Sequence, residues 1–80
     1  MINNSSSLVK GQRLKVDLEM VKDRLPREIL RQLREEPIGN LIGYKMVDGN
    51  NFGLVLELKN GYTSWFFEVE LSELNEEEEI

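Results

Sequence analysis

The sequence predicts a mainly β fold: a small SH3-like antiparallel barrel with one short helix inserted after the first strand. Several stretches alternate apolar and polar residues, which is typical of strands with one buried face. Turn sequences separate the later stretches, and a segment with helical spacing follows the first one. A sheet this small must cover both its apolar face and its edges, and curling into a barrel does both.

The first strand is predicted over residues 8–20, where four apolar residues alternate with charged ones: Leu14, Val16, Leu18 and Met20. Residues 21–36 break this alternation and predict a short helix with Pro26 in its first turn. Pro37 ends the helix because the residue before a proline avoids helical angles. An apolar stripe would dock the helix on the sheet: Leu25, Ile29, Leu30 and Leu33.

Three more strands are predicted over residues 38–47, 52–58 and 61–71. Asp48-Gly49-Asn50-Asn51 and Lys59-Asn60-Gly61 supply the turns between them. The last strand carries most of the aromatic side chains. A period of two places Thr63, Trp65, Phe67, Val69 and Leu71 on its core face, and it places Tyr62, Ser64, Phe66, Glu68 and Glu70 on the opposite face.

The chain of 80 residues is long enough for one domain and one core. We expect a disordered N-terminal arm (1–7), an SH3-like domain (8–74) and a disordered acidic tail (75–80). The sequence has no Cys and no His, so it lacks thiolates and the commonest zinc ligand and general base. We therefore expect no catalytic residues, no cofactor and no metal. Without a signal-like or membrane-spanning stretch, we expect the chain to stay soluble on the side where it is translated.

The net charge of −5 is unevenly distributed. Residues 1–34 carry eight Lys and Arg against four Asp and Glu, a net of +4. Residues 35–80 carry two against eleven, a net of −9. The overall sign argues against nucleic acid as a partner, because such binding needs a basic footprint. The asymmetry would instead orient the molecule on a charged partner or membrane surface.

Three blocks of the sequence resemble the PetP family, the small peripheral subunit of the cytochrome b6f complex in cyanobacteria and red-algal plastids. They are DRLPREI (23–29), IGYKMVDG (42–49) and SWFFEVEL (64–71), and the resemblance spans roughly residues 11–74. It implies an SH3-like fold without a cofactor. It also implies peripheral attachment to the cytoplasmic side of the thylakoid membrane, or the stromal side in a plastid. The sequence PIGNL (37–41) departs from the pattern of the family.

Basic side chains on and before the helix are candidates for partner binding: Lys22, Arg24, Arg27, Arg31 and Arg34. They would meet acidic side chains of the membrane subunits of cytochrome b6f or anionic lipid headgroups. The alternative is a solvated helix face, with Glu28 and Glu35 both placed to pair with Arg31.

The aromatic pair Tyr62 and Phe66 is a second candidate for partner binding, because exposed aromatic residues near loops often bind partners. The alternative is that strand curvature buries both. The acids Glu68, Glu70 and Glu73 lie close in sequence, but outward Glu residues on a strand are ordinary. A metal site at residues 48–51 is the remaining alternative, and a turn explains all four residues.

The resemblance implies an accessory subunit of cytochrome b6f that affects the stability of the complex and the regulation of photosynthetic electron transport. The composition agrees with a non-enzymatic role, and we expect a monomer when the protein is isolated. The alternative is a free soluble SH3-like adaptor that binds a peptide or a small electron-transfer protein such as ferredoxin.

Overall fold

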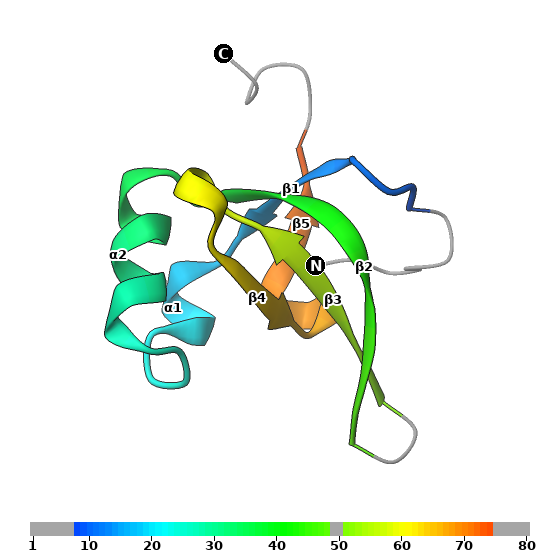
Figure 1. Cartoon of the computed structure of the whole chain (residues 1–80). Coiled ribbons are helices and arrows are strands. Elements are labelled where there is room, and N and C mark those ends of the chain that lie inside the picture. The colour runs from blue at the N-terminus through cyan, green and yellow to red at the C-terminus, as the bar shows by residue number, and fades with distance from the viewer. Residues whose placement is uncertain (1–7, 49–50, 75–80) are drawn as a thin grey trace.

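A computed structural model describes residues 8–48 and 51–74, with only the backbone at residues 47, 48 and 51. In this part of the chain, five antiparallel strands form one sheet in the order β4-β3-β2-β1-β5 (Figure 1). The predicted mainly β fold with a helical insertion after the first strand is confirmed. The elements are β1 (Arg13–Val16), α1 (Leu18–Val21), α2 (Arg27–Glu35), β2 (Ile38–Asp48), β3 (Asn51–Glu57), the 3-10 turn η2 (Lys59–Gly61), β4 (Thr63–Phe66), the 3-10 turn η3 (Glu68–Glu70) and β5 (Leu71–Glu73).

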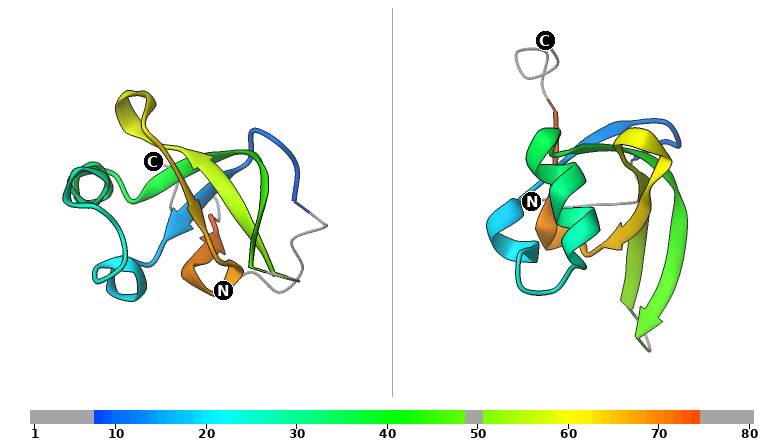
Figure 2. Two further views of the ribbon diagram at one scale, coloured as in Figure 1. Left: turned by 60° about the horizontal axis from the view of Figure 1, so that its bottom comes forward. Right: turned by 60° about the vertical axis from the view of Figure 1, so that its left-hand side comes forward.

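The sheet curls strongly, as the two further views show (Figure 2). Strands β4 and β5 form its opposite edges, yet only η3 joins them. In a flat sheet the two edges would lie about 19 Å apart, since neighbouring strands are about 4.8 Å apart. A 3-10 turn rises only about 2 Å per residue. The short η3 connection therefore brings the two edges together. The predicted arm (1–7) and tail (75–80) lie outside the described residues.

The first strand is shorter than predicted, and its expected span over residues 8–20 is wrong. Pairing ends at Val16, and the carboxylate of Asp17 then accepts a hydrogen bond from the backbone N–H of Glu19 (3.1 Å). This cap starts the single turn α1, which places Val21 in the core and leaves Met20 exposed. Leu18 continues the apolar alternation of the strand and is also the first residue of α1, so the alternation alone does not show where the strand ends.

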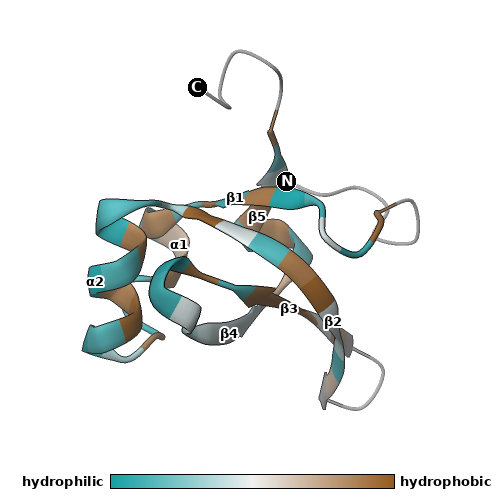
Figure 3. Cartoon of the chain, turned by 45° about the horizontal axis from the view of Figure 1, so that its top comes forward, coloured by the Kyte–Doolittle hydropathy of each residue, from teal (hydrophilic) through white to brown (hydrophobic). Residues whose placement is uncertain are grey.

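Helix α2 follows the prediction closely. It begins after Pro26, ends at Glu35 and packs its apolar stripe against the sheet. Figure 3 shows the hydrophobic side of α2 turned toward the sheet and a hydrophilic outer side. The core that it joins consists of Leu8, Leu14, Val16, Val21, Leu30, Leu33, Leu41, Leu54, Leu56, Leu58, Phe66 and Leu71.

The hairpin of β2 and β3 is the longest part of the sheet. Its strands pair from Asn40↔Glu57 to Asp48↔Asn51, with a bulge between Leu41 and Gly43. Gly39 is required by close packing, because a Cβ there would lie 2.9 Å from Leu56 Cβ. The predicted turn between these strands lies partly outside the described residues, at 49–50. The second turn, at Lys59–Gly61, has the expected positive φ at Asn60 (64°) and Gly61 (81°).

The prediction of one continuous strand over residues 61–71 is wrong, and so is its assignment of Phe66 to the outer face, although Leu71 lies in the core as predicted. Phe66 pairs with the buried Leu54 and is itself fully buried, whereas Trp65 and Phe67 are half-buried and Val69 is 43% exposed. The chain turns at η3 because the Glu70 carboxylate accepts the N–H of Phe67 (2.8 Å). The alternation in the sequence therefore spans two strands and a turn.

Candidate docking surface

The outer side of α2 carries Arg27, Arg31 and Arg34, which we call the Arg row. All three side chains are exposed, on the side of the helix away from Ile29 and Leu33, which pack with the core. Their spacing of four and three residues places them along one stripe of the helix. No ion pair or side-chain hydrogen bond joins them to other described residues. The Arg row therefore presents three exposed guanidinium groups that no side chain within residues 8–48 and 51–74 compensates.

The expected pairs within the helix do not form. Glu35 forms an ion pair with Lys59 of η2 (3.3 Å) instead of pairing with Arg31. The half-buried Glu36 pairs with Arg13 of β1 (3.4 Å). The amide of Asn60 donates to the buried Gln32 (3.0 Å). These contacts tie one flank of α2 to the sheet and its turns, so the helix holds the Arg row in a fixed place.

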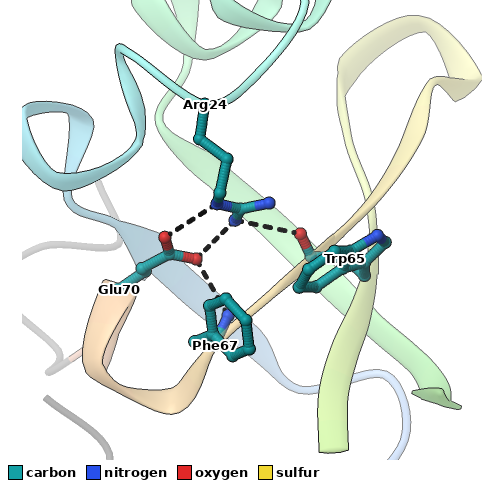
Figure 4. Close-up of polar contacts among 4 residues, drawn as sticks. All are labelled: Arg24, Trp65, Phe67 and Glu70. Carbon is teal, nitrogen blue, oxygen red and sulfur yellow. Dashed lines mark hydrogen bonds and ion pairs between the residues drawn. The ribbon is translucent and has the colours of Figure 1, made fainter. Parts of the chain in front are cut away.

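A second set of contacts fixes the loop before α2. Arg24 donates from Nε to Glu70 Oε2 (3.0 Å) and from Nη2 to Glu70 Oε1 (2.5 Å), a bidentate ion pair (Figure 4). The same Nη2 donates to the backbone oxygen of Trp65 (3.3 Å). Its guanidinium carbon lies 4.6 Å from the Trp65 ring centre and 5.5 Å from that of Phe67. The two rings pack edge to face, 5.0 Å apart. We call these four residues the Arg24 latch.

The Arg24 latch joins two of the sequence blocks noted above. Arg24 lies in the block at 23–29, and the other three latch residues lie in the block at 64–71. Glu70 is only 5% exposed, so its charge needs the partner that Arg24 supplies. The latch joins the helical insertion to η3 across the open edge of β4. Arg24 is therefore engaged within the fold and lies apart from the Arg row.

The remaining predicted site residues separate in the structure. Lys22 pairs with Glu19 (2.8 Å), and this hydrogen bond and charge raise the pKa of Lys22 and lower that of Glu19. Tyr62 is 38% exposed. Phe66, predicted on the outer face, is in the core because its register with Leu54 turns it inward. Its side chain is not accessible to a partner in this structure. The structure thus brings together only Arg27, Arg31 and Arg34.

An exposed apolar surface at the far end of the β2–β3 hairpin was missed by the sequence analysis. Tyr44, Met46 and Phe52 are each about half exposed, and the pairs Tyr44↔Leu54 and Met46↔Phe52 place them on one side of the hairpin. We call this group the hairpin patch. Alternation predicts Phe52 to be buried with Leu54, but the hairpin extends beyond the core (Figure 1). The signal in the sequence that could have indicated this is the length of the predicted strand at residues 38–47, which is long for a domain of this size.

Within the described residues, no group of three or more His, Cys, Asp or Glu side chains could hold a metal ion. Of the three acids that lie close in sequence at 68–73, Glu70 belongs to the Arg24 latch and Glu73 accepts a hydrogen bond from Gln12 (3.0 Å). One surface hollow of about 530 Å³ lies at the end of β1 and the start of α1, and another of about 320 Å³ lies over β2 and the end of β3. The described part of the chain has no helix long and apolar enough to span a membrane.

The fold and the Arg row define a small mainly β domain with a basic helical face. A family model described as "Cytochrome b6f, subunit Tsr0524-like" matches residues 10–72. The chain therefore belongs to this family of cytochrome b6f subunits, which is the PetP family that the sequence resembles. Comparisons with curated proteins and with solved structures found no match.

Proposed function

We propose that this chain is a non-enzymatic accessory subunit of the cytochrome b6f complex that docks through the Arg row on the cytoplasmic face of the complex, or on the stromal face in a plastid. The family match supports association with the complex. The observation that carries the choice of surface is the Arg row itself, three exposed guanidinium groups without a described partner on a helix tied down along one flank and at its N-terminal loop.

The partner surface would carry carboxylates of the membrane subunits, with anionic lipid headgroups as a further contact. Guanidinium groups bind carboxylates and phosphates in a two-pronged geometry. Each basic residue near an anionic membrane surface is worth about 1 kcal/mol. Three such residues on a rigid helix would support reversible, salt-sensitive attachment. The subunit would then act by contact, stabilising the complex and regulating photosynthetic electron transport.

The direct test is charge reversal within the Arg row. We expect Arg27→Glu with Arg31→Glu to weaken co-purification of the tagged protein with the complex. Both side chains are exposed and pair with no other residue in the described part of the chain, so the fold should be retained. A matched control reverses two exposed lysines away from α2, Lys10→Glu with Lys45→Glu, and changes the net charge equally. Co-purification that is unaffected by the α2 change, or equally reduced by the control, would remove the Arg row as the docking surface.

The soluble adaptor remains the competing hypothesis, and a fractionation experiment separates the two. An accessory subunit should appear with the membranes and be released by a high-salt wash, because surface electrostatics weaken with ionic strength. A protein found only in the soluble fraction, and absent from preparations of the complex, would favour the adaptor. Crosslink mapping on the intact complex would then identify the contact residues directly.

A further inference from the structure

We propose that the acidic segment at residues 76–79, four consecutive glutamates, binds the C-terminal half of the Arg row at Arg31 and Arg34 and competes there with outside anionic partners. The contact itself is a property of the isolated chain. Only its consequence, a weaker hold on the complex, rests on the proposed function. The occupant is thus a named segment of this chain, identified by its charge.

The first argument is the balance of charges around α2. The nearby acids Glu19, Glu35 and Glu36 are each already engaged by a cation, Lys22, Lys59 and Arg13 respectively, at 2.8 to 3.4 Å. The Arg row has no such partner among the described residues. An approaching carboxylate at the outer side of α2 therefore meets three guanidinium groups without a described partner. Against them stands one acid of the same helix that also has no described partner, Glu28. Charge complementarity favours the acidic segment at this surface.

The second argument is where the acidic segment is attached. Val16 pairs with Leu71 of β5, and its N–H donates to the carbonyl of Pro37 (2.9 Å), directly after α2. Pro37 and Ser72 also line one common hollow. Strand β5 and the start of β2, which follows α2 directly, thus flank the same strand, β1. Strand β5 runs in the same direction as β2 and reaches the level of Gly39 at Glu73, so the acidic segment must turn back toward α2. Figures 1 and 2 show the end of β5 and the C-terminal end of α2 at the same end of the molecule.

The third argument is reach. Ser72 of β5 and Ile38 of β2 both pair with Lys15 of β1. Two strands that flank a third are about 10 Å apart, so Ser72 lies at about that distance from Ile38. An extended chain covers up to about 17 Å over residues 75–79. Helix α2 ends three residues before Ile38, with Arg34 in its last turn. The glutamates therefore reach Arg34 and Arg31, at the near end of the helix, more readily than Arg27.

The expected strength is modest and salt-dependent. Tethering supplies an effective concentration on the order of millimolar, without which single exposed ion pairs would be weak. A face occupied half of the time lowers the apparent affinity of a competing partner about twofold. The Debye length falls from about 8 Å at physiological ionic strength to about 3 Å at 1 M salt, so high salt should release the segment.

Paramagnetic relaxation on the full chain tests the contact. The sequence has no Cys, so Ile80→Cys carries a single nitroxide label at the end of the acidic segment. We expect loss of amide signal intensity in the last two turns of α2 at low salt, with the intensity restored at about 1 M salt. Replacing all four glutamates at 76–79 by Gln, or Arg31→Gln with Arg34→Gln, should restore it as well. A control with Lys10→Gln and Lys45→Gln should keep the signal loss.

Two results would overturn the proposal. One is a wild-type spectrum without intensity loss on α2, or with a loss that persists after the four Glu→Gln changes. The other is equal loss in a mixture of isotope-labelled unmodified protein and spin-labelled unlabelled protein, which would place the segment on a second copy. Binding to the purified complex is a separate readout. The variant with Gln at all four positions 76–79 should bind the complex at least about twofold more tightly than the wild type. If the Arg row proves not to dock on the complex, the relaxation result still decides the intramolecular contact.

Discussion

The helical end and the hairpin end of this domain both present uncovered side chains, but for opposite reasons. At the helical end, the exposed groups are charged and the element beneath them is secured by a core stripe, the Arg24 latch and the Gln32–Asn60 hydrogen bond. At the hairpin end, the exposed groups are apolar, and the strands that carry them run past the core. A docking function fits the rigid, charged end better, because a fixed row of cations loses little freedom on binding.

The largest contrast should appear between two phenylalanines of the same sheet. Phe66 is fully buried, so Phe66→Ala should lower the free energy of unfolding by about 3–5 kcal/mol. Phe52, in the hairpin patch, is 55% exposed. Phe52→Ala should therefore lower the free energy of unfolding by less than about 1 kcal/mol. Urea denaturation of both variants measures the difference. Similar losses would show that the hairpin end is packed as firmly as the core.

The Arg24 latch should give the next largest effect. Arg24→Met leaves the buried Glu70 carboxylate without its cation, and we expect a loss of about 2 kcal/mol, reduced from the fully buried case because Arg24 is partly exposed. The double variant with Glu70→Gln should lose less than the sum of the single changes, with a coupling of about 1 kcal/mol or more. Denaturation of the four proteins measures this coupling. Simple additivity would mean that the latch contributes nothing as a pair.

A smaller effect should separate two glycines of β2. Gly39→Ala places a Cβ 2.9 Å from Leu56 Cβ, and the resulting strain should cost about 1–3 kcal/mol. Gly43→Ala is the matched control, since nothing lies within 4 Å of its added Cβ. Thermal melting of the two variants should therefore differ clearly. Equal melting temperatures would indicate that the hairpin shifts freely near its root.

The smallest effect concerns the exposed pair of α1. Lys22 lowers the pKa of Glu19, so the pair contributes at neutral pH, and its contribution is lost as pH falls through that lowered pKa. Lys22→Met should raise the pKa of Glu19 toward its ordinary value, as followed by NMR titration of the side-chain carboxyl. An unchanged titration curve would show that the pair does not form in solution.

Much of this architecture was predictable, because helical and strand periodicities report which side of an element is buried. The stripe of α2, the turn at Asn60 and Gly61, and the outward Arg row follow from spacing alone. The errors arose where alternation continued through a change of element. Asp17 starts α1 and Glu70 closes η3 by side-chain bonds to the backbone, which strand periodicity does not register.

The Arg24 latch could not be predicted, because it joins residues 41 and 46 positions apart in sequence. Its members looked like a surface cation, a core aromatic pair and an ordinary outward acid. Pairing depends on the curl of the sheet, which brings η3 beside the loop before α2. The hairpin patch was missed for a related reason, since burial at the end of a long hairpin depends on where the core stops.

One titration tests the central claim most directly: binding of the purified protein to isolated cytochrome b6f complex, compared among the wild type, Arg27→Glu with Arg31→Glu, and Met46→Ser with Phe52→Ser. We predict that the α2 variant loses binding while the hairpin variant binds like the wild type. Loss of binding in the hairpin variant, with wild-type binding in the α2 variant, would contradict the account and move the docking surface to the opposite end of the molecule.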